Sequence, residues 1–373
     1  MPDPELQVVT GAVIAYRLFE VAYTADLSEA ERLWAQKARS LSTRGRLDTT
    51  SPKAVAFGVP PLELTLDPID LRVGTDIASA EVTMRLYDFG VVTFALRLPA
   101  DRLSWTAFSA FVNLVNQSVG PGADTDVWTN LLTEFRANFA GALVRPTGST
   151  LEEDYLIGSV TTFDEILTAD ALRERVDLVP LLSGEQRPLS AAARHDLLGQ
   201  RFSYYTDDLV VLTWDRAFIY EPRRDSDVAD IIEVANAQLL EMRYYDELLD
   251  SELPRMYALV EGTQRTSSLL ASRRFANLAR RLSALVAEVT ELTEKVDNAL
   301  QVTEDVYLAR VYASALELFR VPAFGAAVDR KLAIVRETYT ALYQEASAAR
   351  AALMEGIIVV LIAIEIIVAL THI

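Results

Sequence analysis

Six aspartates between positions 207 and 230 form the densest set of side chains that could bind a divalent cation. Carboxylate oxygens are the ligands that Mg²⁺ and Ca²⁺ take in proteins. Aspartate also closes turns and caps helices, and these residues fall at expected turns and before an expected helix. A structural role is therefore the preferred interpretation, and a metal site remains the alternative. The residues are Asp207, Asp208, Asp215, Asp225, Asp227 and Asp230.

Few other residues in the sequence could support nucleophilic or metal-centred catalysis. The chain has no cysteine and two histidines, which excludes thiolate chemistry and zinc sites built on cysteine. His195 precedes Asp196 and could act as an oriented base, but no nucleophile lies nearby in the sequence, so a surface helix position is preferred. Neither of the common glycine-rich phosphate motifs occurs. We expect no catalytic residue, no cofactor, no resident metal and no enzymatic activity.

An arginine cluster stands out in a chain whose formal net charge is −18. Such a cluster can bind an anionic lipid, RNA phosphate or an acidic partner, or it can pair with the acidic residues around it. The overall charge argues against direct nucleic-acid binding. The cluster comprises Arg265, Arg273, Arg274, Arg280 and Arg281.

The stretch 356–370 contains a single charged residue, Glu365, and follows Glu355 and Gly356. An apolar helix of this length comes close to the thickness of a hydrocarbon core, which predicts a membrane anchor over 354–373. The alternative is the central helix of a soluble bundle. Four cations precede the segment, which favours a single pass with the bulk of the chain in the cytoplasm. They are Arg330, Lys331, Arg336 and Arg350.

Apolar residues spaced alternately by three and four positions predict a coiled coil before this tail. The first seam comprises Phe275, Leu278, Leu282, Leu285, Val289, Leu292 and Val296, and a second, out of phase, includes Leu332, Val335, Tyr339 and Leu342. The change of phase predicts a helical hairpin with its turn near 298–305 and a kink near Pro322. A turn at Pro322 itself is the alternative.

The sequence pattern of the front half predicts a mixed or antiparallel sheet with helices. Expected strands and hairpins cover 8–23, 80–98, 151–163 and 202–220, a helix capped by Ser28 follows the first strand, and further helices cover 105–119 and 126–143. Similar patterns at 87–94 and 205–212 raise a duplicated half-domain as one interpretation. The expected organisation is an α+β domain over 1–225, connecting helices over 226–263, a coiled-coil helical hairpin over 264–353 and a transmembrane helix over 354–373.

The C-terminal residues resemble the "required for meiotic nuclear division" family of domain-of-unknown-function proteins. The resemblance rests on the runs 306–312, 328–332 and 353–365 with Tyr339 and Leu342, and it departs at Gly356, where that family usually has tryptophan. It implies an oligomerising, membrane-anchored non-enzyme, whose eukaryotic members support translation at the mitochondrial inner membrane.

The sequence thus predicts a non-catalytic scaffold held on the bilayer, with the α+β domain on a coiled-coil stalk. We expect a homo-oligomer and an unidentified protein partner. An enzyme using the aspartate-rich hairpin, with a metal or a small ligand, is the alternative, and an anionic-lipid or RNA binder using the arginine cluster is a further one.

Overall fold

The computed structural model describes residues 5–37, 59–185, 187–223, 227–264 and 305–371, with separate positions between 277 and 290. Internal contacts divide the chain into two units. The first, here called the sheet unit, comprises Met1–Glu241 and Lys295–Pro322, and the second, the helical unit, comprises Met242–Glu294 and Ala323–Ile373. Each unit is described by itself.

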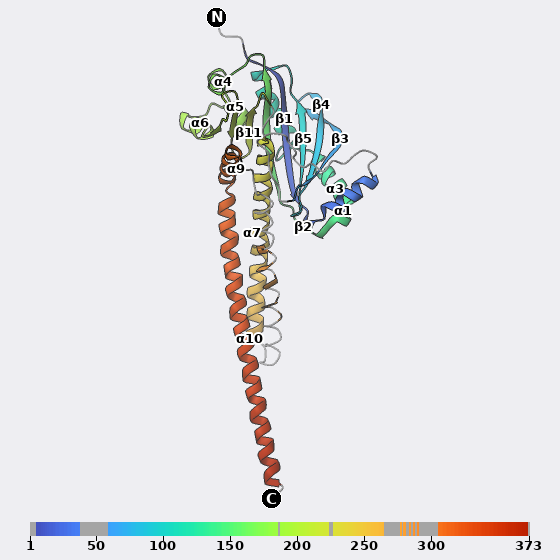
Figure 1. Cartoon of the computed structure of the whole chain (residues 1–373), viewed down its shortest axis with the longest axis vertical. Helices are drawn as coiled ribbons and strands as arrows, with labels where there is room; N and C mark the ends of the chain where they lie inside the picture. The colour runs from blue at the N-terminus through green and yellow to red at the C-terminus, as the bar shows by residue number, and fades with distance from the viewer. Residues whose placement is uncertain are drawn as a thin grey trace. The chain divides into compact units, whose positions relative to one another are not determined.

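A nine-stranded mixed sheet forms the centre of the sheet unit (Figure 1). Its order is β3-β4-β5-β1-β8-β11-β10-β9, with β6 paired to one end of β1. Only the β8 and β11 pair is parallel among the described strands. The strands are β1 (Gln7–Glu20), β3 (Leu62–Val73), β4 (Asp76–Leu86), β5 (Val91–Pro99), β6 (Leu103–Ser104), β8 (Glu152–Phe163), β9 (Gln200–Phe202), β10 (Leu209–Leu212) and β11 (Arg216–Tyr220). The predicted α+β front half with a mixed sheet is confirmed.

Strand β1 is the central strand and is buried on both faces along most of its length. Its side chains alternate, as a strand requires. Arg17 lies on the face that carries α2 and α3, where its guanidinium donates to the Val119 carbonyl at 3.2 Å. Tyr16 lies on the opposite face, where α7 brings Asp230 and Glu233 close.

Helix α2 (Trp105–Val119) covers the first face of the sheet together with α3 (Val127–Phe139) and α1 (Leu27–Lys37). Ser104 caps α2, because its side chain accepts a hydrogen bond from the Ala107 backbone N–H. The α2 bounds agree with the helix expected at 105–119. For α1 the expected cap was wrong, because Asp26 and not Ser28 accepts the first backbone N–H groups of the helix.

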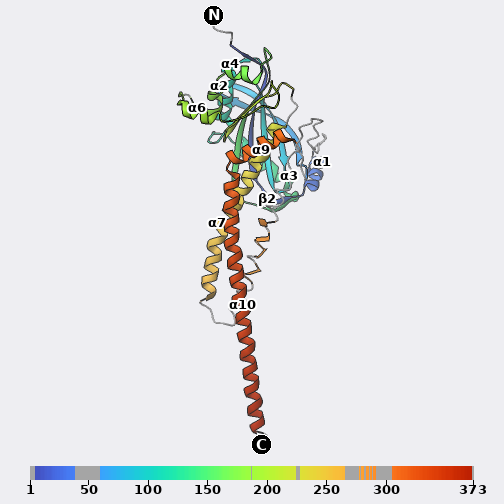
Figure 2. The same cartoon turned by 60° about the vertical axis from the view of Figure 1, so that its left-hand side comes forward.

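Helix α7 (Val228–Gln264) covers the opposite face with its first four turns. Residues 231–241 are all buried, which is typical of a helix enclosed by protein on every side. Helix α9 (Val306–Leu318) lies beside these turns in both views (Figures 1 and 2), and the Tyr312 hydroxyl donates to Gln238 Oε1 at 2.7 Å. Asp305 caps α9 by accepting from two backbone N–H groups.

Short elements surround this sheet. The sequence did not predict the helices α4 (Ala169–Arg175) and α5 (Val179–Ser183), whereas α6 (Ala191–Leu197) is the surface helix expected around His195. A separate two-stranded sheet pairs β2 (Ala22–Ala25) with β7 (Leu143–Pro146), and a 3-10 turn, η1 (Ala140–Ala142), follows α3. The hairpin between β4 and β5 turns at Asp88, Phe89 and Gly90, as the sequence predicted.

The helical unit contains the second part of α7 and most of α10 (Val321–Thr371). Lys331 of α10 contacts Asp246 and Asp250 of α7, each at 2.6 Å. Of the expected seam, Val289, Leu332 and Val335 are buried, and Tyr339 is half-buried. The side chains of the other expected seam residues lie outside the described part: Phe275, Leu278, Leu282, Leu285, Leu292, Val296 and Leu342.

A new helix begins next to Pro322. Helix α9 ends at Leu318, Arg320 adopts a positive φ of 59°, and Pro322 is the second residue of α10. Proline is tolerated at this position because the backbone N–H groups of the first turn have no partner within the helix. The expected turn at 298–305 lies largely outside the described residues.

The length and hydropathy of the helices bear on whether the chain could cross a membrane. Across the described stretches, no single helix meets the length and hydropathy needed to cross a bilayer. One bent pair, Val306–Leu318 with Val321–Ala341, meets them by length and composition alone.

Candidate functional site

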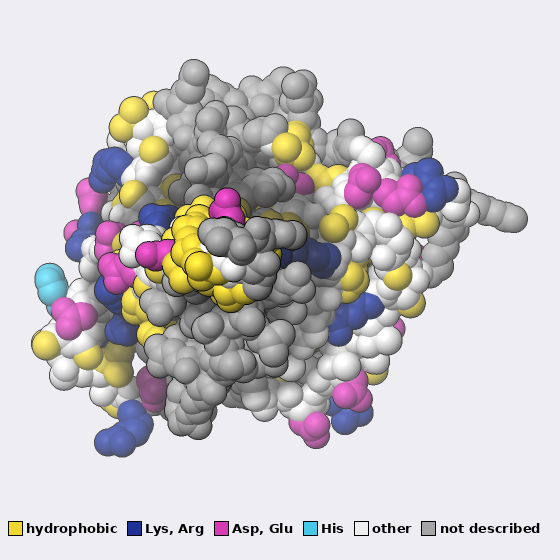
Figure 3. All heavy atoms as spheres, turned by 90° about the horizontal axis from the view of Figure 1, so that it is seen from below, with side chains coloured by type: hydrophobic (Ala, Val, Ile, Leu, Met, Phe, Trp, Pro, Cys, Tyr) yellow, Lys and Arg dark blue, Asp and Glu magenta, His cyan; other side chains and the backbone are white. Residues whose placement is uncertain are grey.

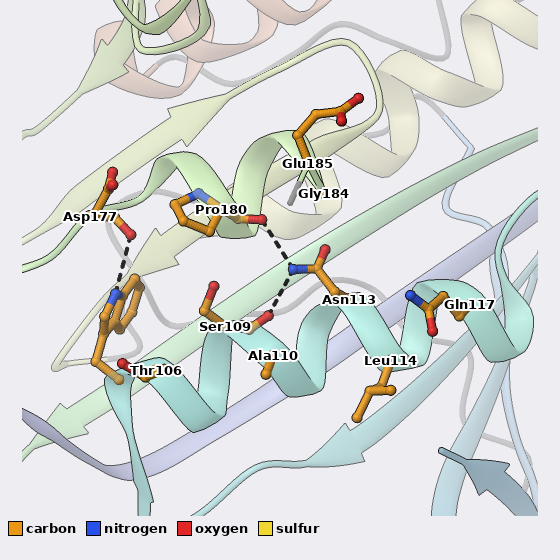
Figure 4. A pocket seen from close by; sticks show the side chains of 11 residues that line it. Thr106, Ser109, Ala110, Asn113, Leu114, Gln117, Asp177, Pro180, Gly184 and Glu185 are labelled. Carbon is orange, nitrogen blue, oxygen red and sulfur yellow. Dashed lines mark hydrogen bonds between the residues drawn. The ribbon is translucent and has the colours of Figure 1, made fainter. Parts of the chain in front are cut away.

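A cavity of about 610 Å³ lies between α2 and the segment around α5, in the sheet unit (Figure 4). This volume falls within the usual range of small-molecule sites. Its walls come from one flank of α2 and from the chain that enters and leaves α5. The lining residues are Trp105, Thr106, Ser109, Ala110, Asn113, Leu114, Gln117, Asp177, Pro180, Gly184 and Glu185.

Trp105 closes one end of the cavity. Its indole Nε1 donates to the Asp177 backbone carbonyl at 3.2 Å, and its ring packs edge-on against Phe218 of β11 with centroids 5.5 Å apart. The tryptophan therefore ties the first turn of α2 to both the sheet and the segment before α5. This end of the cavity is preformed.

Asn113 joins three elements at the opposite wall. Its amide nitrogen donates to the carbonyls of Ser109 and Pro180, each at 3.1 Å (Figure 4). Its Oδ1 accepts from the guanidinium of Arg216 at 2.7 Å. The same guanidinium nitrogen donates to the Leu181 carbonyl at 2.9 Å. One amide thus fixes α2 and α5 to a buried arginine of β11.

Burial lowers the pKa of Arg216, and the carboxylate of Asp215, 3.6 Å away, opposes that effect. Gly184 ends α5 in the left-handed region with φ of 67°. A Cβ at this position would lie 2.6 Å from the Arg216 Nη2. Glycine therefore lets the chain close tightly over the guanidinium, behind the cavity wall.

Ser109 is the polar group at the floor. The residue is 6% exposed, and its hydroxyl has no hydrogen-bond partner within the described part of the chain. Figure 4 shows this hydroxyl on the side of α2 that faces α5. A buried hydroxyl without a partner costs stability, so a ligand that hydrogen-bonds to Ser109 would remove that cost.

Two carboxylates lie at the rim of the cavity, and they differ in whether a neighbouring group hydrogen-bonds to them. Asp177 is engaged, because it accepts from Arg194 at 3.0 and 3.2 Å and from the Val179 backbone N–H. The exposed Glu185 side chain has no partner among the described residues. A mostly apolar wall with a hydroxyl and a rim carboxylate suits a small amphipathic ligand that carries a hydrogen-bond donor or a positive charge.

The aspartates singled out from the sequence have separate structural tasks. Asp208 is buried and accepts from the backbone N–H groups of Tyr204 and Tyr205, so it closes the turn before β10. Asp215 accepts from Thr213, and Asp207 lies 3.5 Å from Arg223.

The remaining three aspartates do not join this turn. Asp230 pairs with Arg85 of β4, and Asp227 is buried before α7. Asp225 lies outside the described residues. Among the described side chains, no three histidines or carboxylates are arranged to hold a metal ion.

The other predicted residues also lie apart from the cavity. His195 is exposed on α6. Of the arginine cluster only Arg280 is described, with its guanidinium 2.5 Å from Asn277 Oδ1, and Arg265, Arg273, Arg274 and Arg281 lie outside the described part.

Sequence analysis missed a buried ionic network under α7. Arg85 of β4 contacts Glu63 at 2.7 Å, Glu233 at 2.6 Å and also Asp230. The Tyr87 hydroxyl donates to Glu233 at 2.9 Å. Burial raises the pKa of Glu233, and Arg85 counters that effect. Arg85 falls on the polar side of the alternation in β4, where a charge usually faces water, so nothing local in the sequence indicates its burial.

Comparison with known proteins identifies the sheet unit. A family model described as "Uncharacterized protein MJ0711, N-terminal domain" matches residues 10–227, which is more than half of the chain. The chain belongs to this family. The matched stretch contains every residue that lines the cavity, together with Arg216.

A relative has been found in an archaeon. The uncharacterized protein MJ0711 of Methanocaldococcus jannaschii is 27% identical over 197 residues, covering 52% of this chain and 59% of the relative. The chain thus spans about three fifths of that relative. No solved structure matches.

This membership corrects the resemblance drawn from the C-terminal residues. Assignment to the "required for meiotic nuclear division" family was wrong, since the model that matches is that of MJ0711 and it covers the front of the chain. Seam spacing and an apolar tail with an acid are features that unrelated stalked proteins share.

Proposed function

We propose that this protein is a non-catalytic scaffold, anchored in a membrane by the end of α10, with the sheet unit as its partner-binding part. The observation that carries the proposal is the exposure of the α10 tail. The large apolar side chains from Ile357 to Leu370 whose burial is described are 47–69% exposed. Seen from below, hydrophobic side chains gather around the end of this helix (Figure 3).

Water is a poor solvent for such a surface, because each apolar Å² left exposed forgoes about 25 cal/mol. The helix from Met354 to Thr371 spans about 27 Å at 1.5 Å per residue. A hydrocarbon core of about 30 Å matches this length with slight local thinning. Exposure all round, rather than on one face, favours lipid over a partner groove as the surrounding medium.

Glu365 lies within the apolar stretch and is exposed, and Glu355 with Gly356 precedes it. A carboxylate near the membrane centre costs about 2.5 to 3.5 kcal/mol. Contact with the same residue of another copy, sharing a proton, would reduce that cost. This supports a homo-oligomer. Lys331 and the arginines before the anchor support a cytoplasmic location for the rest of the chain.

A non-catalytic role is supported by how the aspartates are used. Asp208 closes a turn, and Asp207, Asp215 and Asp230 each pair with an arginine. Their oxygens are committed to the fold.

Membrane fractionation tests the anchor. The full chain should resist alkaline carbonate washing, and a chain ending at Leu353 should be released. Ile362→Lys, at mid-depth, should weaken retention, because a central cation costs about 3 kcal/mol. Ile357→Lys, near the end of the stretch, is the matched control and should stay bound, since a terminal lysine reaches the interface. Release of the full chain, or equal loss in both lysine variants, would contradict the proposal.

A second candidate function is binding of a small amine in the cavity between α2 and α5. The unpartnered hydroxyl of Ser109 and the rim carboxylate of Glu185 favour it. Phenethylamine, phenylacetate and 2-phenylethanol share one body and differ in head-group charge, so they serve as probes.

The amine should raise the unfolding temperature of the full chain, and phenylacetate should not. Ala110→Trp fills the cavity and should abolish the shift. Ala107→Trp, on the same helix but outside the lining, should keep it. No shift with the amine, or the same shift in both variants, would contradict this binding site.

A further inference from the structure

Four arginines line another cavity of the sheet unit, here called the arginine cavity. Its volume is about 720 Å³, and Asp177 is the one lining residue that it shares with the cavity between α2 and α5. Helices α4 and α6 lie on the same side of the sheet (Figure 1). In a chain whose formal net charge is −18, such a concentration of cations indicates an anionic ligand. The arginines are Arg173 and Arg175 of α4, Arg194 of α6 and Arg201 of β9.

Local structure sets the positions of these arginines. Thr168 caps α4 and Ser190 caps α6, each through its side-chain oxygen. Strand β9 is the last strand of the sheet, and Phe202 beside Arg201 is buried. Because side chains alternate along a strand, the burial of Phe202 turns Arg201 outward.

Two of the four guanidinium groups are already held by carboxylates. Arg175 donates to Glu165 at 2.6 Å. Arg194 donates to both oxygens of Asp177, at 3.0 and 3.2 Å. These two arginines therefore contribute fixed positive charge at the wall of the cavity.

Arg173 and Arg201 are the two that a ligand could engage. Arg173 pairs with Asp170 at 3.2 Å, but that carboxylate side chain is 88% exposed, and water weakens such a pair. The Arg201 side chain makes no hydrogen bond or ion pair with another described residue. The lining carboxylates, Asp170, Glu174 and Asp177, are all exposed and are outnumbered by the arginines.

An adjoining cavity of about 550 Å³ has tyrosines in its wall and is here called the tyrosine cavity. It shares Arg173 and Arg201 with the arginine cavity. Tyr204 lines it and is 54% exposed, and its ring packs edge-on against Tyr205 and Tyr307 with centroids 4.8 and 5.5 Å apart. The two available guanidinium groups thus lie where the cavities meet, with an oriented aromatic ring beyond them.

We propose that the arginine and tyrosine cavities together bind a mononucleotide, with its phosphates on Arg173 and Arg201 and its base against Tyr204. A phosphate group has enough oxygens for two guanidinium forks, whereas a carboxylate accepts one. A nucleobase offers a flat face that stacks on a tyrosine. This site goes beyond the proposed scaffold role and depends neither on the membrane anchor nor on the amine cavity.

Isothermal titration calorimetry of the full chain in detergent, in a buffer without phosphate, tests the arginines. ADP should bind at least tenfold more tightly than pyrophosphate or adenosine, because only ADP engages both parts of the site. Arg201→Gln and Arg173→Gln should each weaken ADP and pyrophosphate about tenfold, through the loss of charged hydrogen bonds. Arg136→Gln removes the same charge from an exposed position on α3, outside both cavities, and should change neither affinity.

Two tyrosine variants test the base. Tyr204→Leu should weaken ADP about tenfold and leave pyrophosphate unchanged, because stacking acts on the base alone. Tyr257→Leu, on α7 and equally exposed at 54%, should leave both affinities unchanged. Absence of ADP binding, or equal losses in Arg201→Gln and Arg136→Gln, would overturn the proposal. So would pyrophosphate that binds as tightly as ADP.

Discussion

Replacing Gly90 with alanine should be among the most damaging single changes in the sheet unit. Gly90 ends the turn between β4 and β5 with φ of 94°, in the region that residues with a Cβ avoid. Its carbonyl accepts from the backbone N–H groups of Val21 at 3.0 Å and Ala22 at 3.3 Å. The turn therefore holds the chain that leaves the central strand.

The free-energy cost of Gly90→Ala has two parts. The left-handed conformation costs an alanine about 1–2 kcal/mol. The new Cβ would also lie 1.8 Å from the Ala22 carbonyl oxygen, whereas real Cβ atoms stay at least 3.0 Å from a neighbour. The two backbones must separate by about 1.2 Å, which stretches both hydrogen bonds at roughly 1 kcal/mol each. The total is about 3–4 kcal/mol.

A substitution at Gly122 measures the conformational penalty alone, so the difference between the two variants gives the cost of the close approach. Gly122 has a similar φ of 80°, but nothing lies within 4 Å of the position its Cβ would take. Gly122→Ala should therefore cost only the conformational penalty of about 1–2 kcal/mol.

Urea unfolding of the full chain in detergent, followed by tryptophan fluorescence, measures both. The Gly90→Ala midpoint should fall well below that of Gly122→Ala at equal slope, and the melting temperature should fall by roughly 10 °C against roughly 4 °C. If the two alanine variants lose the same stability, the close approach of Gly90 to Ala22 plays no part, and the reasoning is refuted.

Three further changes test other contacts of the structure. Arg85→Met should cost about 3–5 kcal/mol in urea unfolding, because it leaves buried Glu233 without its cation, and adding Glu233→Leu should recover most of that loss. A loss that the second change leaves in place would contradict this. Ser109→Ala should leave stability unchanged or raise it by up to about 1 kcal/mol, since the hydroxyl has no partner in the described chain; a clear loss would show that the hydroxyl is bonded. Lys331→Met should lower stability by at most about 1 kcal/mol, because the contact with Asp246 is only partly shielded from water, and 1 M salt should reduce the difference between the two chains.

In the front half, local sequence patterns were sufficient to predict helices and strands that pack one face against the core. Helix α2 is confirmed from Trp105 to Val119, since its apolar residues recur at helical spacing and Ser104 is a strong cap. The β4–β5 hairpin follows from alternation on both arms and from Gly90 at the turn.

Pairing between distant segments was not predictable. Nothing local in β11 indicates that it pairs in parallel with β8, more than fifty residues earlier. The helices α4 and α5 are at most seven residues long, too short for periodicity to indicate them. The duplicated half-domain stays a prediction.

The cavity and the burial of Glu20 could not be predicted for a related reason. Asn113 is an ordinary polar residue on an amphipathic helix until Arg216, 103 residues away, reaches it. Glu20 stands at the end of an alternating strand, where an acid usually faces water, and only the position of α7 buries it. Both depend on contacts that tertiary packing alone creates.

The central position of β1 has a consequence for synthesis. This strand is made before its two partners, since it pairs with β5, some eighty residues later, and with β8, about 140 residues later. At about 5–20 residues per second, both edges of this apolar strand stay open for roughly 4–16 s, until β5 is made, and one edge stays open for roughly 7–30 s, until β8 is made. A strand in that state is a template for wrong pairing. The ribosome-bound chain therefore passes through an interval in which holding factors, rather than its own fold, protect it from aggregation.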